Sequence, residues 1–183
     1  KSARPPPTSW RRPRRTGARL YIVHTSSREA LEAGLRARDA GTDILIETCP
    51  HYLTLSEERY DAPEDEAARF IISPPLRARA QHEHLWNALA AGQLDCVGSD
   101  HVPRSRAGER AKNLTSFVDI PNGAPGIETR VPLVYDPGVT GGELSLERFV
   151  DVVATAPAAL FGLERKGAIE VGRDADLVIW NPD

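Results

Sequence analysis

The chain has 183 residues, of which 40% are hydrophobic and 27% are charged, a composition typical of a soluble globular domain. Its net charge of −3 is unevenly distributed. Residues 1–17 hold six of the 23 basic residues and no acidic residue, so the remainder carries about −9. A domain with this negative charge is a poor candidate for binding nucleic acid, which is itself negatively charged. No apolar run approaches the roughly 20 residues of a membrane span.

Residues 1–17 combine four prolines with five arginines and almost no aliphatic side chains. Such a segment supplies no stripe of apolar residues that could face a core, so we expect it to be disordered or irregular. Two interpretations stay open at this point. The segment is either an arm that binds an acidic partner or a non-native end of the chain.

Three short apolar runs predict three β-strands, at residues 18–24, 43–48 and 94–99. The first is rich in β-branched residues, which is typical of a strand buried on both faces. Helical patterns separate the strands. One follows a capping box of Ser26 and Glu29 and ends near Gly41, and the other follows the prolines at 74–75 and ends near Gly92. This alternation predicts a parallel sheet with right-handed connections.

The rest of the chain predicts different structure. Residues 101–142 are rich in Gly, Pro and Arg, which indicates a long loop. A helix begins after Ser145, and a further short helix has Pro157 in its first turn. Residues 167–183 alternate like antiparallel strands joined by a Gly-Arg-Asp turn. The change of periodicity indicates a domain boundary near residue 166.

Polar residues capable of chemistry follow each predicted strand. His24 ends the first strand, Cys49-Pro50-His51 follows the second, and Asp100-His101 follows the third. Functional residues of parallel α/β folds collect at the carboxyl ends of strands. A His and an Asp at matching strand ends are able to ligate a metal together. A hydrogen-bonded histidine at a strand end is the alternative for His24.

A series of motifs then follows in a fixed order. They read LYIVHTSS, ETCPHYLTL, SPPLR, GSDHVP, PNGAPGIETR, PAALFGL and KGAIEVGRDADLVIW. These motifs and their order resemble the hydantoinase/dihydropyrimidinase family of metal-dependent amidohydrolases, and the resemblance covers residues 17–183. The resemblance implies an α/β fold, the incomplete C-terminal part of a (β/α)8 TIM-type barrel in residues 18–166. It also implies the start of a small β-sandwich domain in residues 167–183.

The resemblance also implies roles for individual residues. His24 matches a metal-binding histidine, and Asp100 matches the aspartate that ligates metal and shuttles the proton. Ser73 and Asn122 match positions whose backbone groups hold the cyclic substrate. Enzymes of this kind hold two divalent metals, usually zinc, bridged by hydroxide and a carboxylated lysine. That lysine, a His-x-His pair and another metal histidine match no position here, which predicts an incomplete and by itself inactive fragment.

The implied reaction is hydrolysis of the cyclic amide of hydantoins or dihydropyrimidines to N-carbamoyl amino acids. The implied partners are a small cyclic amide or imide and, for a full-length relative, further copies in a dimer or tetramer. Neither nucleic acid nor membrane is expected, and the compartment is the cytoplasm. Allantoinase-like and dihydroorotase-like hydrolases are alternatives within the enzymes. A non-catalytic scaffold related to dihydropyrimidinase is the alternative outside them.

Three further features have simpler interpretations. His82 and His84 imitate a His-x-His metal pair, but they lie in a helical pattern, where residues two apart point in different directions. We therefore expect a surface feature there. His51 and His101 lie beside strand ends and are interpreted as supporting residues. Cys49 and Cys96 are far apart and form no paired motif, so we expect two small buried apolar side chains rather than a disulfide.

Overall fold

The computed structural model describes residues 17–103 and 120–181. Its centre is a parallel sheet of three strands in the order β1, β2, β3. The strands are β1 (Leu20–Ile22), β2 (Ile44–Thr48) and β3 (Cys96–Val97). β1 pairs with β2 in the register Tyr21 to Leu45, and β2 pairs with β3 in the register Glu47 to Cys96. The parallel arrangement predicted from the sequence is confirmed, and each strand is shorter than its apolar run.

The two faces of the sheet differ in burial. Along β2, Ile44, Ile46 and Thr48 are buried, whereas the intervening Leu45 and Glu47 are only half-buried. Side chains alternate between the faces of a strand, so one face is sealed by helices and the other is more open. All three residues of β1 are half-buried. The expectation that β1 is buried on both faces is therefore wrong, because the described elements cover neither of its faces completely.

Helix α2 (Arg28–Asp39) connects β1 to β2 and packs on β2. Its N-cap is Ser27, whose Oγ accepts a hydrogen bond from the Ala30 amide at 3.3 Å. The predicted capping box of Ser26 and Glu29 is thus wrong, because the N-cap lies one residue later and the residue three positions after it is Ala30, which has no side-chain acceptor. Gly41 follows the helix with a φ of 82°, a left-handed conformation that glycine adopts without steric cost.

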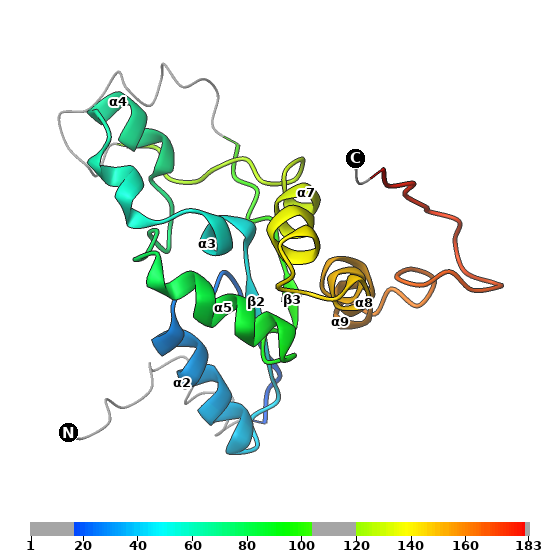
Figure 1. The fold of residues 1–183 in the computed structure, drawn as a ribbon. Coiled ribbons are helices and arrows are strands. Elements are labelled where there is room, and N and C mark those ends of the chain that lie inside the picture. The colour runs from blue at the N-terminus through cyan, green and yellow to red at the C-terminus, as the bar shows by residue number, and fades with distance from the viewer. Residues whose placement is uncertain (1–16, 104–119, 182–183) are drawn as a thin grey trace.

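Short helices cover the route from β2 to β3. They are α3 (Pro50–Thr54), the 3-10 turn η1 (Glu57–Asp61), α4 (Glu64–Ala67), the 3-10 turn η2 (Ala68–Phe70) and α5 (Ala80–Ala90). Helices α2, α5 and α3 are stacked along one side of the strands (Figure 1). The buried side chain of Trp86 joins α5 to α3, since its Nε1 donates to the Leu53 carbonyl at 3.2 Å.

The segment predicted as a long loop contains a helix, so that prediction is wrong for part of residues 101–142. Helix α7 (Arg130–Tyr135) continues into a π-helical turn, η5 (Asp136–Thr140). Pro132 lies in the first turn of α7, where its missing amide hydrogen breaks no helical bond. Val134 is fully buried, so packing against the core selects the helix although the neighbouring prolines and glycines favour a loop. Residues 104–119 of the predicted loop lie outside the described residues.

The two helices predicted after Ser145 form one helical run. It comprises α8 (Leu146–Val150), the π-helical turn η6 (Asp151–Thr155) and α9 (Ala156–Leu160). Ser145 caps it as predicted, by accepting from the Arg148 amide at 3.1 Å. Arg148 also donates to the Leu89 and Leu94 carbonyls at 2.8 and 2.6 Å. Arg130 donates to Val97 and Val153 at 3.1 and 3.2 Å, which ties this run to β3.

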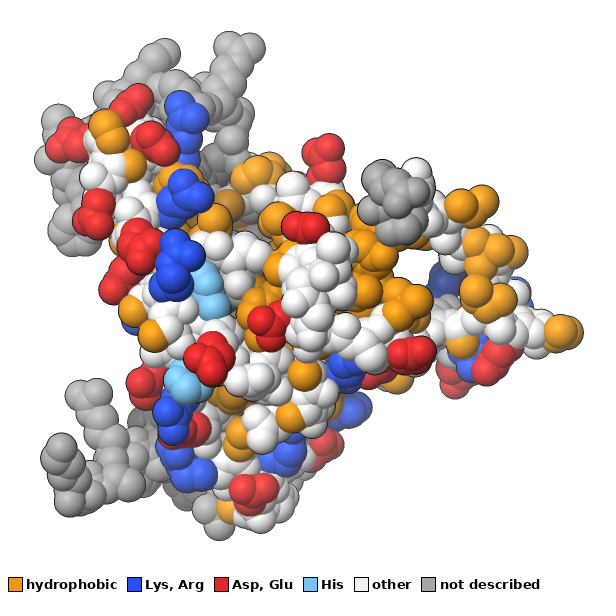
Figure 2. Space-filling view, viewed as in Figure 1, with side chains coloured by type: hydrophobic (Ala, Val, Ile, Leu, Met, Phe, Trp, Pro, Cys, Tyr) orange, Lys and Arg blue, Asp and Glu red, His pale blue; other side chains and the backbone are white. Residues whose placement is uncertain are grey.

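Residues 167–181 form an extended arm rather than the predicted antiparallel strands. The expected turn is present, since Gly172 has a φ of 94° and the Arg173 amide donates to the Glu170 carbonyl. No strand in the described ranges pairs with the arm, and its apolar side chains are therefore exposed (Figure 2). The arm leaves α9 and its end returns towards α7, where the rings of Trp180 and Tyr135 lie 5.1 Å apart (Figure 1).

Residues 1–16 lie outside the described residues, so the expectation for the basic segment is untested apart from Gly17. Among residues 17–103 and 120–181, no helix is both long enough and apolar enough to cross a membrane.

We expect Asp95→Ala to lower the free energy of unfolding by about 1–3 kcal/mol, because it leaves charged and amide donors unpaired in a partly buried place. Oδ2 of Asp95 accepts from Arg38 Nη2 and from the Ile46 amide, each at 2.6 Å. Urea unfolding measures the change. Glu32→Ala, which breaks the exposed pair with Arg28, is the control and should have a much smaller effect. Equal losses for both variants would contradict this account.

Candidate active site

The ends of β1 and β3 share an unusual backbone conformation. His24 and Asp100 have φ values of 45° and 44°, and they are the only non-glycine residues with positive φ among the described residues. This left-handed region is sterically disfavoured for side chains, at a cost of about 1–3 kcal/mol for each residue. Because β1 and β3 both run parallel to β2, the two turns lie at the same edge of the sheet. Strained turns of this kind concentrate at functional sites.

His51 follows the strand that lies between β1 and β3. It lies in α3 directly after β2, and its Nε2 is buried without a hydrogen-bond partner. Burial lowers the pKa of His51 from 6.5 to about 4; the negative charge of Asp100 opposes the shift and His24 adds to it. The imidazole is therefore neutral at physiological pH. Both charges act on His51, so His24 and Asp100 each lie within electrostatic range of this histidine.

Glu47 is a site residue that sequence reasoning missed. It lies on the more open face of β2, where Tyr21 Oη donates to its Oε2 and the His24 amide donates to its Oε1 at 3.4 Å. A single acidic residue within an apolar strand was the available signal. Burial, followed by the charges of Glu47 and Asp100, raises the pKa of the Cys49 thiol. Cys49 therefore lies near both carboxylates.

His101 fastens a neighbouring loop to the Asp100 turn. Its Nδ1 accepts hydrogen bonds from the amides of Gly126 and Ile127, at 3.0 and 3.2 Å. An imidazole nitrogen that accepts carries no proton, so the proton of neutral His101 is on Nε2. The Val102 amide donates to the Ala124 carbonyl at 3.0 Å, which adds a second link. The structure thus gives His101 the supporting position expected from the sequence.

The two predicted substrate-binding residues lie together. Nδ2 of Asn122 donates to Oγ of Ser73 at 2.9 Å, and both side chains are exposed. The Gly123 amide donates to the Ile71 carbonyl at 3.0 Å, which holds the two segments side by side. Gly123 also abuts Val102, next to the Asp100 turn. Residues 49 positions apart are therefore brought to the same edge of the molecule as Asp100.

The simpler interpretations of the remaining histidines and cysteines are consistent with the structure. His82 and His84 lie on α5 and are partly exposed, and His82 Nε2 is 2.8 Å from the Leu55 carbonyl oxygen. Cys49 and Cys96 are buried free thiols, as predicted. Cys96 makes a further polar contact, since its Sγ lies 3.3 Å from Tyr21 Oη. Burial raises the pKa of Cys96 to about 11, so this thiol is protonated at neutral pH.

His24 and Asp100 provide the donors that suit a divalent metal. An imidazole nitrogen and a carboxylate oxygen are both ligands that zinc takes in proteins. In the part of the chain that the structure describes, no group of three or more His, Cys, Asp or Glu residues is placed to hold a metal ion. These two residues therefore fit part of a metal site and lack the three protein ligands typical of catalytic zinc.

Comparison with known proteins identifies the family of this chain. The profile of the Amidohydrolase family matches residues 22–183. The chain belongs to the amidohydrolase family. The amidohydrolase relatives include the D-hydantoinase of Ralstonia pickettii, 46% identical over 167 residues, and that of Geobacillus stearothermophilus, 45% identical over 167 residues. In both cases the match covers 91% of this chain and 36% of the relative.

Solved amidohydrolase structures show the same arrangement of elements. The D-hydantoinase (dihydropyrimidinase) from Thermus sp. superposes with a TM-score of 0.88 at 43% identity, over 91% of this chain and 36% of that one. The dihydropyrimidinase from Brevibacillus agri has a TM-score of 0.86 at 39% identity, over 94% and 39%. The chain therefore has an α/β fold similar to part of these structures, and it spans little more than a third of their length.

We expect stability to fall as the pH is lowered from about 6.5 to 4, because the folded state disfavours protonation of His51. The unfolded chain binds a proton at His51 near pH 6.5, whereas the folded chain binds it only near pH 4. The stabilisation is complete above pH 6.5 and disappears through this window, by about 2–3 kcal/mol. Urea unfolding at pH 7 and pH 4.5 measures the difference. His51→Gln should flatten the pH dependence, and an unchanged slope in this variant would refute the assignment.

Proposed function

We propose that this chain carries part of the active site of a cyclic amidohydrolase that opens hydantoins or dihydropyrimidines to N-carbamoyl amino acids. The observation that supports it best is the position of His24 and Asp100. Both occupy strained turns at one edge of the sheet, and both act on His51. The names of the relatives, D-hydantoinase and dihydropyrimidinase, favour this substrate class over allantoin or dihydroorotate. A scaffold protein has no need of a metal-type donor pair.

We propose zinc as the metal, held in part by His24 and Asp100. When bound, the metal lowers the pKa of water and polarises the carbonyl of the substrate. The carboxylate of Asp100 takes the proton of the attacking water at Oδ and delivers it to the ring nitrogen as the C–N bond breaks. Backbone groups at Ser73 and Asn122 hold the ring. Two observations support a single substrate-binding surface at this edge of the molecule. Asn122 contacts Ser73, and His101 anchors the loop that follows Asn122.

The proposed domain organisation follows from the same resemblance. Residues 18–166 would supply the last three strands and the C-terminal helices of a (β/α)8 barrel, and residues 167–183 the start of a β-sandwich. Three parallel strands alternating with helices support the first part. Three strands do not close a barrel. The remaining strands, the further metal ligands and assembly into a dimer or tetramer would belong to the complete enzyme.

We expect the 183-residue chain alone to open neither hydantoin nor dihydrouracil faster than a metal-free control. Two donors are too few to fix a pair of metals, which need a bridging carboxylate and several imidazoles. Less than one tightly bound zinc per chain should be found by elemental analysis. Zinc-dependent hydrolysis that is lost in Asp100→Asn would contradict this prediction, because the chain would then hold a complete site.

A chimera tests the proposed reaction directly. Residues 17–183 would replace the matching 36% of the D-hydantoinase of Geobacillus stearothermophilus. We expect the chimera to open hydantoin, and Asp100→Asn to reduce its kcat by about 10²–10⁴-fold, the usual contribution of a general acid–base group. Asp65→Asn, on the exposed surface of α4, is the matched control. A chimera that binds zinc and keeps full activity with Asn at position 100 would rule out the proposed role of Asp100.

A further inference from the structure

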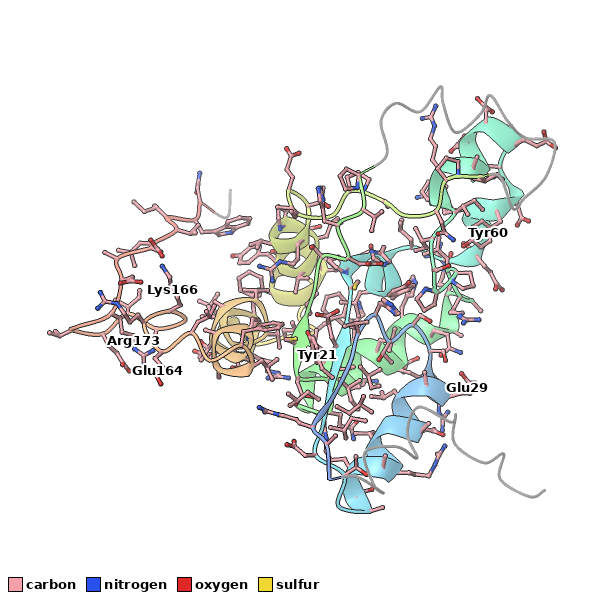
Figure 3. The ribbon with its side chains drawn as sticks, turned by 180° about the vertical axis from the view of Figure 1, so that it is seen from behind. Tyr21, Glu29, Tyr60, Glu164, Lys166 and Arg173 are labelled. Atoms are coloured by element: carbon pink, nitrogen blue, oxygen red, sulfur yellow. The ribbon has the colours of Figure 1, made fainter. Side chains whose placement is uncertain are left out.

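A hydrogen-bonded group of side chains crosses the more open face of the sheet. Tyr21 on β1, Glu47 on β2 and Cys96 on β3 share this face, and Figure 3 shows Tyr21 beside the neighbouring strands. Tyr21 Oη donates to Glu47 Oε2 and lies 3.3 Å from Cys96 Sγ. Burial and the bonds to Cys96 and Glu47 raise the pKa of Tyr21, so its phenol keeps the donated proton.

Glu47 also accepts hydrogen bonds from the turn at the end of β1. Its Oε1 accepts from the His24 amide at 3.4 Å, and its main-chain carbonyl accepts from the Thr25 amide at 2.8 Å. Thr48 adds a third bond, since its Oγ1 donates to the Thr25 carbonyl at 2.8 Å. The left-handed conformation of His24 is thus held from β2, by one side-chain oxygen and two bonds at the following residue.

Gly98 leaves the space that the Glu47 carboxylate occupies. A Cβ at position 98 would overlap the carboxylate, and the three nearest heavy atoms would all belong to it. The backbone at Gly98 is not left-handed, so alanine is sterically allowed there by its own φ. The position of this carboxylate is therefore fixed from three sides, by Tyr21, by Gly98 and by the His24 amide.

We propose that Glu47 is a positioning residue. Its carboxylate, oriented by Tyr21, fixes the strained backbone of His24 so that the imidazole is presented at the edge of the sheet beside Asp100. The hydrogen bonds described above support the effect of Glu47 on the His24 backbone, whereas the consequence for metal binding by His24 rests on the proposed function. Hydrogen-bonded partners behind a metal ligand set its orientation and commonly change metal affinity by about 10–100-fold.

Two measurements test this role, the first on the 183-residue chain and the second on the chimera described above. The first is hydrogen exchange at the His24 amide. In Glu47→Leu we expect exchange to be about tenfold faster, the equivalent of one lost hydrogen bond. The second is zinc titration of the chimera followed by calorimetry, in which the dissociation constant should rise by about 10–100-fold in Glu47→Leu. Glu47→Gln keeps an oxygen acceptor and should stay within about threefold of the wild type in exchange, since its hydrogen bond survives.

Gly98→Ala separates the position of the carboxylate from its charge. The added methyl group displaces the carboxylate while Glu47 itself remains, so this variant should resemble Glu47→Leu. Asp95→Asn is the matched control. It perturbs a carboxylate that accepts from the Ile46 amide in the middle of β2, on the side of β3 rather than of His24, and should leave both His24 exchange and zinc affinity unchanged.

Each outcome decides a separate point. Equal acceleration of exchange throughout the chain, in Asp95→Asn as well, would overturn the proposal in favour of a general loss of stability. Faster exchange at His24 with unchanged zinc affinity would overturn the positioning role. If the chimera with Glu47 and Gly98 intact binds no zinc, the metal half of the proposed function fails. His24 exchange in Glu47→Leu and Gly98→Ala then still decides whether Glu47 holds the turn.

Discussion

The structure depends on β2, the only strand that pairs on both edges within the described residues. Its main chain bonds to β1 and β3, its Ile44 and Ile46 face the helices, and Glu47 faces the other side. A parallel strand needs both a covered face and a fixed register, because a slip by one residue exchanges the faces. The Asp95 carboxylate, which accepts from the Ile46 amide, locks this register near the amino end of β3.

This central strand also places the chemistry. The turns after β1 and β3 come to one edge because both neighbours run parallel to β2. Burial beneath that edge keeps His51 neutral, while Glu47 and Thr48 hold the turn that follows β1. The stability of the sheet and the geometry of the proposed site therefore depend on the same residues. The strain at His24 and Asp100 is held in place by the pairing that also forms the core.

The sequence predicted the strands, their direction and the edge of the sheet that carries both His24 and Asp100, because apolar runs and strand ends are local signals. The assignments that failed depend on distant contacts. Helix α7 forms because Val134 reaches the core, although its neighbours favour a loop. The strands expected after residue 167 do not form, since no described strand pairs with them. Glu47 was missed because its importance comes from Tyr21 and Gly98, 26 and 51 residues away.

The arm of residues 167–181 is attached at both ends. Thr155 donates to the Gly167 carbonyl at 2.8 Å at one end, and the Trp180 ring contacts the Tyr135 ring in a tilted arrangement at the other. A ring contact of this kind contributes about 0.5–1.5 kcal/mol beyond its buried area. Releasing the end of the arm also regains conformational entropy, which offsets part of the free energy of that ring contact. The exposed apolar side chains of the arm, among them Ile169, Val171 and Ile179, therefore cost free energy that a strand paired with the arm would recover by covering them.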